Sequence, residues 1–405
     1  MSARPNVAPH NGKETVVIIG AGSTGLCTAL NLALDTNPGS RKIAVFETLP
    51  NQFEATSGSC TGCLHHDFRG LDHEKLVELG KLSWNLWQKV AEGEKFRIDA
   101  GYKPNCFFDM EHGHGIGLGE LPDWFRFKSS WNADRDQGPN ALVNPKGIGD
   151  WLYSECYRLG VDMWFGATVT AVELSPSNEV KSVTYEKDGA LMRLECQSLV
   201  VAAGPWTPTL YSKLFPASSI KLKSALNAGD WIIFRNPCPK TEKMVAFVAL
   251  NNVLGKKLEF AGRHDNTIWM TGPVEDDAIL PPLGEVAIPT KAKENMLVNY
   301  AREYLAQVCT SSGSPPSTLD VVSKGRAIRP ATNTILPIIS KVDAKDLLNS
   351  DVLFENSSGV FVSWGHGSYG LTLGMGTGKV MSELILGRKP SVDMSIFDIS
   401  RDRAA

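Results

Sequence analysis

The fold is decided by the stretch Val16-Val-Ile-Ile-Gly20-Ala-Gly22-Ser-Thr-Gly25, close to the start of the 405-residue chain. It ends a run of β-branched residues from Glu14, which predicts a short buried strand. The apolar spacing over 26–34 predicts a helix packed on a sheet, and a second strand is expected at 42–47. This strand–turn–helix–strand order requires a parallel sheet with a right-handed crossover.

The three glycines of this stretch match the pattern of dinucleotide-binding folds, because they follow a strand and open a helix. Gly20 allows the tight turn, Gly22 lets backbone N–H groups approach a pyrophosphate, and Gly25 allows close packing of helix and strand. The helix N-terminus would face the phosphates with its partial positive charge. Glu47, which should bind ribose hydroxyls, lies 27 positions after Gly20, where about 20 is usual. The pattern does not choose between NAD and FAD, and a glycine-rich turn without a ligand remains the alternative.

The composition is that of a globular protein, with 42% hydrophobic and 21% charged residues. At about 150 residues per domain the length suggests two or three units. The chain has 41 basic and 44 acidic residues, and its net charge of −3 lacks the excess of positive charge typical of proteins that bind nucleic acid or an anionic membrane. The first dozen residues lack the apolar core of a signal peptide, and no apolar run approaches the roughly 18 residues of a membrane span. We therefore expect a soluble, cytoplasmic protein.

The eight cysteines are too few and too dispersed for a secreted disulfide scaffold. Cys60 and Cys63 form a C-x-x-C pair, which is either a redox pair or sulfur that fills space in a glycine-rich turn. No second pair or histidine partner stands at zinc spacing, and the His65–His66 and His112–His114 pairs lack partners as well. We expect no metal.

The rest of the chain alternates strand and helix patterns around one long insert. Residues 95–140 are rich in Gly, Phe and Trp and are expected to be irregular. The segments expected to be regular are helices at 73–90, 145–158 and 291–308, strands at 161–173, 180–195, 198–204, 231–234 and 267–271, and a strand–turn–helix unit at 360–386.

Two distant segments choose the cofactor. Leu199-Val-Val-Ala-Ala-Gly204-Pro-Trp206 is a strand that ends in small residues, which suits a close approach to a second part of the cofactor. Trp364-Gly-His-Gly-Ser-Tyr-Gly-Leu-Thr372 is a glycine-rich turn before a helix. A P-loop is excluded at Gly378-Lys379, because position 373 is Leu and Val380 follows the lysine.

With these segments the chain resembles the D-amino-acid oxidase superfamily of flavoproteins, which includes glycine and sarcosine oxidases. The matching blocks run in order along nearly the whole chain: 20–30, Asn144-Pro145 with its helix, 160–172, 202–206, Gly325-Arg-Ala-Ile-Arg-Pro330 and 365–372, the last being the most specific. The resemblance implies an α/β fold: a Rossmann-like FAD-binding domain with a parallel sheet, and an interleaved α+β substrate domain with an antiparallel sheet. The implied bounds are 1–75, 141–215 and 325–405 for the first domain, and 76–140 and 216–324 for the second.

The resemblance also implies which residues bind FAD. The ADP half would be bound by Gly20, Gly22, Ser23, Thr24, Gly25 and Glu47. Ser57 and Gly58 would lie near the ribityl–phosphate, and Val169 near the adenine. Gly204 and Trp206 would approach the cofactor from its third side. Those lining the isoalloxazine are Gly365, Gly367, Gly370, Leu371 and Thr372. Ala327 stands where sarcosine oxidases carry the flavin on a cysteine, so we expect non-covalent FAD.

The implied reaction is hydride transfer from the carbon beside an amine to flavin N5, with reoxidation by oxygen. Arg329 aligns with the arginine that binds the substrate carboxylate, for which a planar guanidinium is suited; an ordinary ion pair is the alternative. The Ser368 carbonyl matches the amine-binding position, and His366 is either a partner of the flavin site or a structural residue. Tyr369 stands where sarcosine-type oxidases place a lysine, and Ser368 stands where glycine oxidases place an arginine. Arg329 is thus the one carboxylate anchor left.

Three functions remain open at this point. The first is an oxidase of an amino acid or N-substituted amino acid, and the second is a tailoring oxidase of a larger amine-containing scaffold. The third is a flavin-loaded binding protein without turnover. The aromatic residues of the expected substrate domain form either a roomy pocket or ordinary core; they are Trp84, Trp87, Phe107, Phe108, Trp124, Phe125, Trp131 and Trp231.

Overall fold

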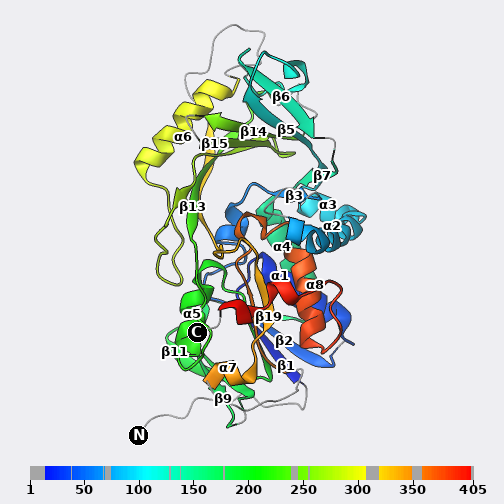
Figure 1. Cartoon of the computed structure of the whole chain (residues 1–405), viewed down its shortest axis with the longest axis vertical. Coiled ribbons are helices and arrows are strands. Elements are labelled where there is room, and N and C mark those ends of the chain that lie inside the picture. The colour runs from blue at the N-terminus through cyan, green and yellow to red at the C-terminus, as the bar shows by residue number, and fades with distance from the viewer. Residues whose placement is uncertain are drawn as a thin grey trace.

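Figure 1 shows the computed structural model as an elongated molecule built around two large sheets. The structure describes residues 14–37, 39–66, 68, 74–126, 129–136, 138–176, 178–238, 245–253, 256–306, 319–348 and 358–402. Within these ranges, no helix combines the length and apolar character that a bilayer-crossing segment needs.

One large sheet has six strands in the order β19-β20-β12-β1-β2-β8. Its parallel strands are β1 (Glu14–Ile19), β2 (Arg41–Glu47), β8 (Asp162–Phe165), β12 (Ser198–Val201) and β20 (Gly359–Trp364), and β19 (Ile338–Lys341) is antiparallel to β20. In the register, Val16 of β1 lies between Ile43 and Ser198. The sheet is therefore assembled from segments that are far apart in the sequence.

Both faces of this sheet are buried, as expected for a parallel sheet. Val16 and Ile18 pack against the helical face, whereas Val17 and Ile19 pack against the other side. The helices of the first face are α1 (Ser23–Asp35), α2 (Val77–Ala91), α4 (Pro145–Arg158) and α8 (Gly374–Ile385). The second face carries the meander β9 (Ala167–Leu174), β10 (Val180–Lys187) and β11 (Ala190–Glu195), with α5 (Thr207–Leu214) and α7 (Ala344–Leu348).

The other large sheet has eight strands and is antiparallel except where β14 runs parallel to β5. Its path is β17 (Glu275–Asp276), β13 (Asn227–Arg235), β16 (Thr267–Thr271), β15 (Lys256–Gly262), β14 (Ala246–Val253), β5 (Cys106–His112) and β6 (Trp131–Asp136), with β18 (Val321–Arg329) on β13. The helix α6 (Lys291–Tyr304) covers one face over a core that includes Trp124, Phe260 and Tyr304. The opposite face carries Trp231, Phe247 and Trp269. A small sheet of β3 (Cys63–His65), β7 (Asn140–Leu142) and β4 (Lys103–Pro104) lies between the two large ones (Figure 1).

The predicted α/β fold class is confirmed, and α4 ends at Arg158 as expected. The expected irregular insert at 95–140 is wrong, because it contains α3 (Glu94–Asp99) and β4 to β7. Its main strand, β5, pairs with β14, whose residues come more than a hundred positions later, so no local pattern reveals the pairing. The domain bounds remain a prediction, and the bound at residue 325 falls inside β18. Position 73, where the second helix was expected to begin, lies outside the described residues, and α2 begins at Val77.

Candidate functional site

A cavity of about 640 Å³ lies where the carboxyl ends of the parallel strands of the six-stranded sheet meet the aromatic face of the eight-stranded sheet. Ligands of open α/β sheets bind at this edge. The first wall comes from residues that follow β1, β2, β12 and β20, and the second from residues of β13, β14, β15, β16 and β18. Seventeen predicted site residues line it: Gly20, Gly22, Ser23, Thr24, Glu47, Ser57, Val169, Gly204, Trp206, Arg329, Gly365, His366, Gly367, Ser368, Tyr369, Gly370 and Leu371. Of the remaining three, Gly25 packs against Gly20, Gly58 against Phe53, and Thr372 against the α2 side.

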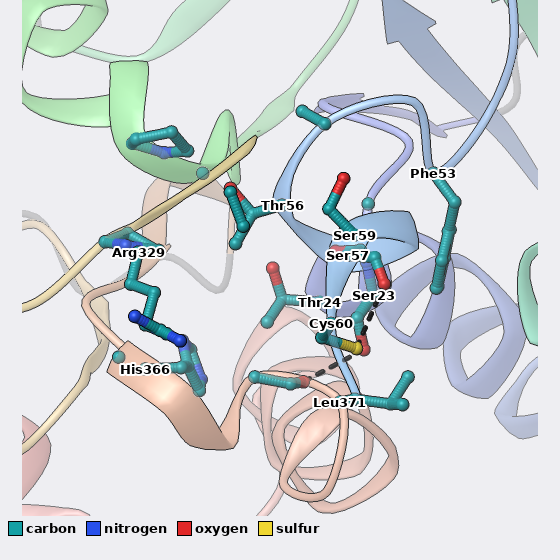
Figure 2. Close-up of a pocket in the computed structure, with 18 of the residues that line it drawn as sticks. Ser23, Thr24, Phe53, Thr56, Ser57, Ser59, Cys60, Arg329, His366 and Leu371 are labelled. Carbon is teal, nitrogen blue, oxygen red and sulfur yellow. Dashed lines mark hydrogen bonds between the residues drawn. The ribbon is translucent and has the colours of Figure 1, made fainter. Parts of the chain in front are cut away.

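The turn after β1 has the geometry that a phosphate cradle needs. Gly20 has φ +110°, and a Cβ there would overlap the carbonyl of Ala202. The first turn of α1 contains no acidic residue, so its N-terminus offers its partial positive charge to the cavity. The Ser23 N–H donates to Ser57 Oγ over 3.0 Å, and Ser23 Oγ donates to the Gly370 carbonyl over 2.9 Å. These bonds join three distant segments around the turn (Figure 2).

Glu47 ends β2 beside this turn, and its carboxylate is fixed by backbone groups. Oε2 accepts from the Ala21 N–H over 2.8 Å, and Oε1 accepts from the Leu49 N–H over 3.0 Å. Burial raises the pKa of Glu47, and these backbone hydrogen bonds oppose the shift. Each oxygen keeps a lone pair for a hydroxyl, as binding a ribose requires.

The glycine-rich loop after β20 folds back on β18. The Gly367 N–H donates to the Pro330 carbonyl over 2.7 Å, and Gly367 has φ +54° with open space where a Cβ would stand. His366 is buried, and its Nε2 lies 3.0 Å from Thr377 Oγ1. Burial lowers the pKa of His366 to about 3, so the ring is neutral at physiological pH. This geometry favours the structural role for His366.

Arg329 enters the cavity from the end of β18 and has no carboxylate partner among the described residues. Its Nη1 donates to Asn227 Oδ1 over 3.1 Å, and Figure 2 shows the side chain reaching towards the loop of His366. Arg326, three residues earlier, instead pairs with Asp230 over 2.8 Å and Glu275 over 3.0 Å. Arg326 therefore makes ion pairs from this strand, whereas the described residues offer Arg329 no such pair.

The wall formed by the large sheet contains residues that sequence reasoning missed. Phe247, Lys257, Glu259, Trp269 and Thr271 all line the cavity from β14, β15 and β16. Alternation along each strand could have indicated two faces, but only the pairing shows which face meets the cavity. Of the predicted aromatic residues Phe107 and Trp231 line the cavity, whereas Trp124, Phe125 and Trp131 pack in the core under α6.

The segment that follows β16 of the eight-stranded sheet also covers the cavity next to Glu47. Val274 lines the cavity just before β17, and Leu283 and Gly284 line it after β17. The indole Nε1 of Trp206 donates to the Pro281 carbonyl over 2.8 Å, and a Cβ on Gly284 would lie 3.1 Å from Thr48 Cγ2. We call residues 274–284 the cover segment.

Cys60 and Cys63 both line the cavity as free thiols. Burial raises the pKa of both groups, and the Cys60 thiol donates to the Ser57 carbonyl over 3.3 Å. Because thiol–disulfide exchange requires a thiolate, this setting favours the space-filling role. Across the part of the chain that the structure describes, no group of three or more His, Cys, Asp or Glu side chains is arranged to hold a metal ion.

The cavity fits an extended dinucleotide. Its lining includes a helix N-terminus with a glycine cradle, a carboxylate fixed by backbone groups, and a glycine-rich loop together with the guanidinium of Arg329. Fold and site together define a dinucleotide-binding protein.

The chain belongs to the DAO family of FAD dependent oxidoreductases, whose model matches residues 15–384. A Schizosaccharomyces pombe protein, C1F5.03c, named for a presumed oxidoreductase activity, is 24% identical over 419 residues, which cover 96% of this chain and 98% of that protein. Glycine oxidase from Geobacillus kaustophilus has a TM-score of 0.73 at 16% identity, covering 96% of this chain and 99% of the oxidase. L-amino acid deaminase from Proteus vulgaris has a TM-score of 0.73 at 14% identity and 99% coverage of both chains. The cofactor of the family is FAD.

Proposed function

We propose that the protein is an oxidase that dehydrogenates the C–N bond of an amino acid or N-substituted amino acid, with oxygen as acceptor and hydrogen peroxide as product. The observation that carries this proposal is Arg329, a cation that lines the cavity beside the glycine-rich loop without a carboxylate partner among the described residues. A partly buried guanidinium in a cavity is stabilised by an anion, and a substrate carboxylate would supply one. The glycine oxidase and the L-amino acid deaminase also act on amino acids by name.

We assign the residues that hold FAD from the same cavity. Gly20, Gly22 and the N-terminus of α1 would bind the pyrophosphate, Glu47 the ribose, and the loop 365–371 the ring. Ala327 lines the cavity, and its methyl side chain cannot form a bond to the flavin; this supports a non-covalent cofactor. Bound FAD supplies a two-electron acceptor for the hydride at the carbon beside the amine.

The remaining tasks fall to side chains and backbone of this chain. Arg329 would fix the carboxylate with two parallel hydrogen bonds, and the Ser368 carbonyl would accept from the amine. Two such anchors fix the position of the carbon between them. A neutral amine needs no side-chain base, and burial lowers the pKa of His366 to about 3, which makes that imidazole a weak base.

The test is anaerobic flavin bleaching and peroxide release with a panel of D-, L- and N-methyl amino acids. Arg329→Ala should lower kcat/KM by about tenfold to a hundredfold, the loss for a charged hydrogen bond. Arg235→Ala, which removes only an exposed pair with Asp320, is the matched control. If no compound bleaches the flavin, or if Arg329→Ala behaves like Arg235→Ala, the proposal fails.

A tailoring oxidase of a larger amine-containing scaffold is the second candidate. It is favoured by the aromatic wall of Phe107, Trp231, Phe247 and Trp269, which exceeds what a small amino acid would cover. Bleaching by large secondary amines, with none by free amino acids, would replace the first proposal by this one.

A further inference from the structure

The wall formed by the large sheet is interrupted by one inward-facing ion pair. Lys257 and Glu259 alternate on β15, so they share the face of the buried aromatic residues. Lys257 Nζ lies 3.2 Å from Glu259 Oε1, with the two side chains 51% and 22% exposed. Burial alone would lower the pKa of Lys257, but the carboxylates of Glu259 and Asp109 raise it, so the amine is charged.

Two further groups complete this corner of the cavity. His65 on β3 lines it, and burial lowers the pKa of its imidazole, which is therefore neutral. Trp269 is 3% exposed, and its indole Nε1 has no hydrogen-bond partner among the described residues. Small Ala249 lies directly across the ladder from Glu259, which leaves room above the pair. We call Lys257, Glu259, His65 and Trp269 the distal cluster.

The distal cluster lies far from Arg329 but on the same cavity. Across the sheet Glu259 is opposite Thr271, Thr271 is opposite Trp231, and Trp231 is opposite Gly325, four residues before Arg329. The path from Glu259 to Arg329 crosses three spacings between neighbouring strands and then four residues along β18. The backbones of the two residues are therefore roughly 20 Å apart. The charge of Lys257 also acts on Tyr369, so the cluster borders the glycine-rich loop. Allowing for side-chain reach, a ligand touching both ends is longer than a simple amino acid.

We propose that the distal cluster binds the far end of the substrate, and that this end is an uncharged group with both a donor and an acceptor, such as a carboxamide. The inference rests on the proposed function of the Arg329 end. Lys257 and Glu259 form an ion pair, and the nearby Asp109 accepts a hydrogen bond from Asn251, so a ligand ion would satisfy one member of the pair and oppose the other. An amide can bind without leaving a charge unpaired, because its N–H can donate to Glu259 while its carbonyl accepts from Lys257.

The test compares four amino acids with similar chains and different ends: Nε-acetyl-lysine, lysine, 2-aminoadipate and norleucine, each as both enantiomers. Anaerobic flavin reduction and peroxide release are measured with the holoenzyme. We expect Nε-acetyl-lysine to exceed norleucine in kcat/KM by about tenfold to a hundredfold, mainly through KM, because binding far from the reacting carbon is uniform.

Charge variants give a readout that a merely structural pair would not move. Lys257→Met leaves Glu259 alone and should shift the preference to lysine, whereas Glu259→Gln leaves Lys257 alone and should shift it to 2-aminoadipate. Lys256→Met is the matched control, because its side chain lies on the other face of β15. Lys256→Met should keep the kcat/KM of the parent protein for all four compounds, so that any change of preference belongs to the two cavity-facing variants.

The outcomes separate the two proposals. Equal turnover of norleucine and Nε-acetyl-lysine, or charge variants with unchanged preference, would overturn the distal cluster while the amino-acid oxidase stands. If no compound reduces the flavin, the proposed function fails and the distal cluster falls with it.

Discussion

We expect the hydrogen bond between Trp206 and the cover segment, which lies outside the phosphate cradle, to control how long FAD stays bound. Trp206, which follows β12, donates its indole Nε1 to the Pro281 carbonyl of the cover segment over 2.8 Å. Because the cover segment closes the cavity beside Thr48 and Glu47, the adenosine half of FAD should leave only when this contact opens. Trp206→Phe keeps an aromatic ring and removes the donor.

The expected size follows from a single neutral hydrogen bond, about 0.5–1.5 kcal/mol. FAD release should therefore be about twofold to tenfold faster, since 1.4 kcal/mol corresponds to a factor of ten. The assay dilutes the holoenzyme and follows the rise of flavin fluorescence. Trp164→Phe is the matched control, because the indole Nε1 of Trp164 is buried without a partner in the described part of the chain. Equal release rates for the two variants would refute the role of the cover segment.

Four further results are expected. Gly284→Ala should also speed FAD release, because Gly284 has φ +91° and a Cβ would crowd Thr48; an unchanged rate would argue against closure at this point. Gly22→Val should weaken FAD binding about fivefold to a hundredfold in equilibrium titration, because a Cβ there already lies 3.0 Å from Ser57 Oγ. Acid denaturation should release all FAD from the polypeptide, and flavin remaining attached would contradict the non-covalent assignment at Ala327. Burial lowers the pKa of His366 to about 3, so the unfolded chain binds the extra proton first; stability should fall as the pH drops from about 6.5 towards 3, and thermal melts of His366→Asn should depend less on pH over this window.

Much of the FAD side of the cavity could be predicted from the sequence, because its signals are local. Gly20, Gly22 and the following helix are adjacent in the chain, and Glu47 ends the next strand along. Gly20 has φ +110°, a backbone conformation that other residues rarely adopt, so glycine is expected at this turn from the motif alone. Arg329 was found only through the resemblance, since a lone arginine has no local signature.

The opposite wall could not be predicted, because its residues are chosen by pairing rather than by pattern. Lys257 and Glu259 look like ordinary solvent-facing residues of an alternating strand. They face the cavity because β15 lies between β14 and β16 with the register that sets Glu259 opposite Ala249 and Thr271. A shift of one residue would turn both side chains to the other face. The insert at 95–140 was misjudged for the same reason, since β5 finds its partner in β14.

The cavity has walls from both large sheets, and this has a thermodynamic consequence. FAD bound at Gly20 and Glu47 would also touch Val274, Leu283 and Gly284 of the cover segment, which follows β16 of the eight-stranded sheet. A ligand that binds only the closed arrangement stabilises that arrangement, so FAD affinity and the contact between the sheets are linked. The linkage is reciprocal: changes at Trp206 or Gly284 should lower FAD affinity, and removal of FAD should loosen the cover segment. Loss of amide-exchange protection in residues 274–284 of the apoprotein, with protection retained in β1, would demonstrate this coupling.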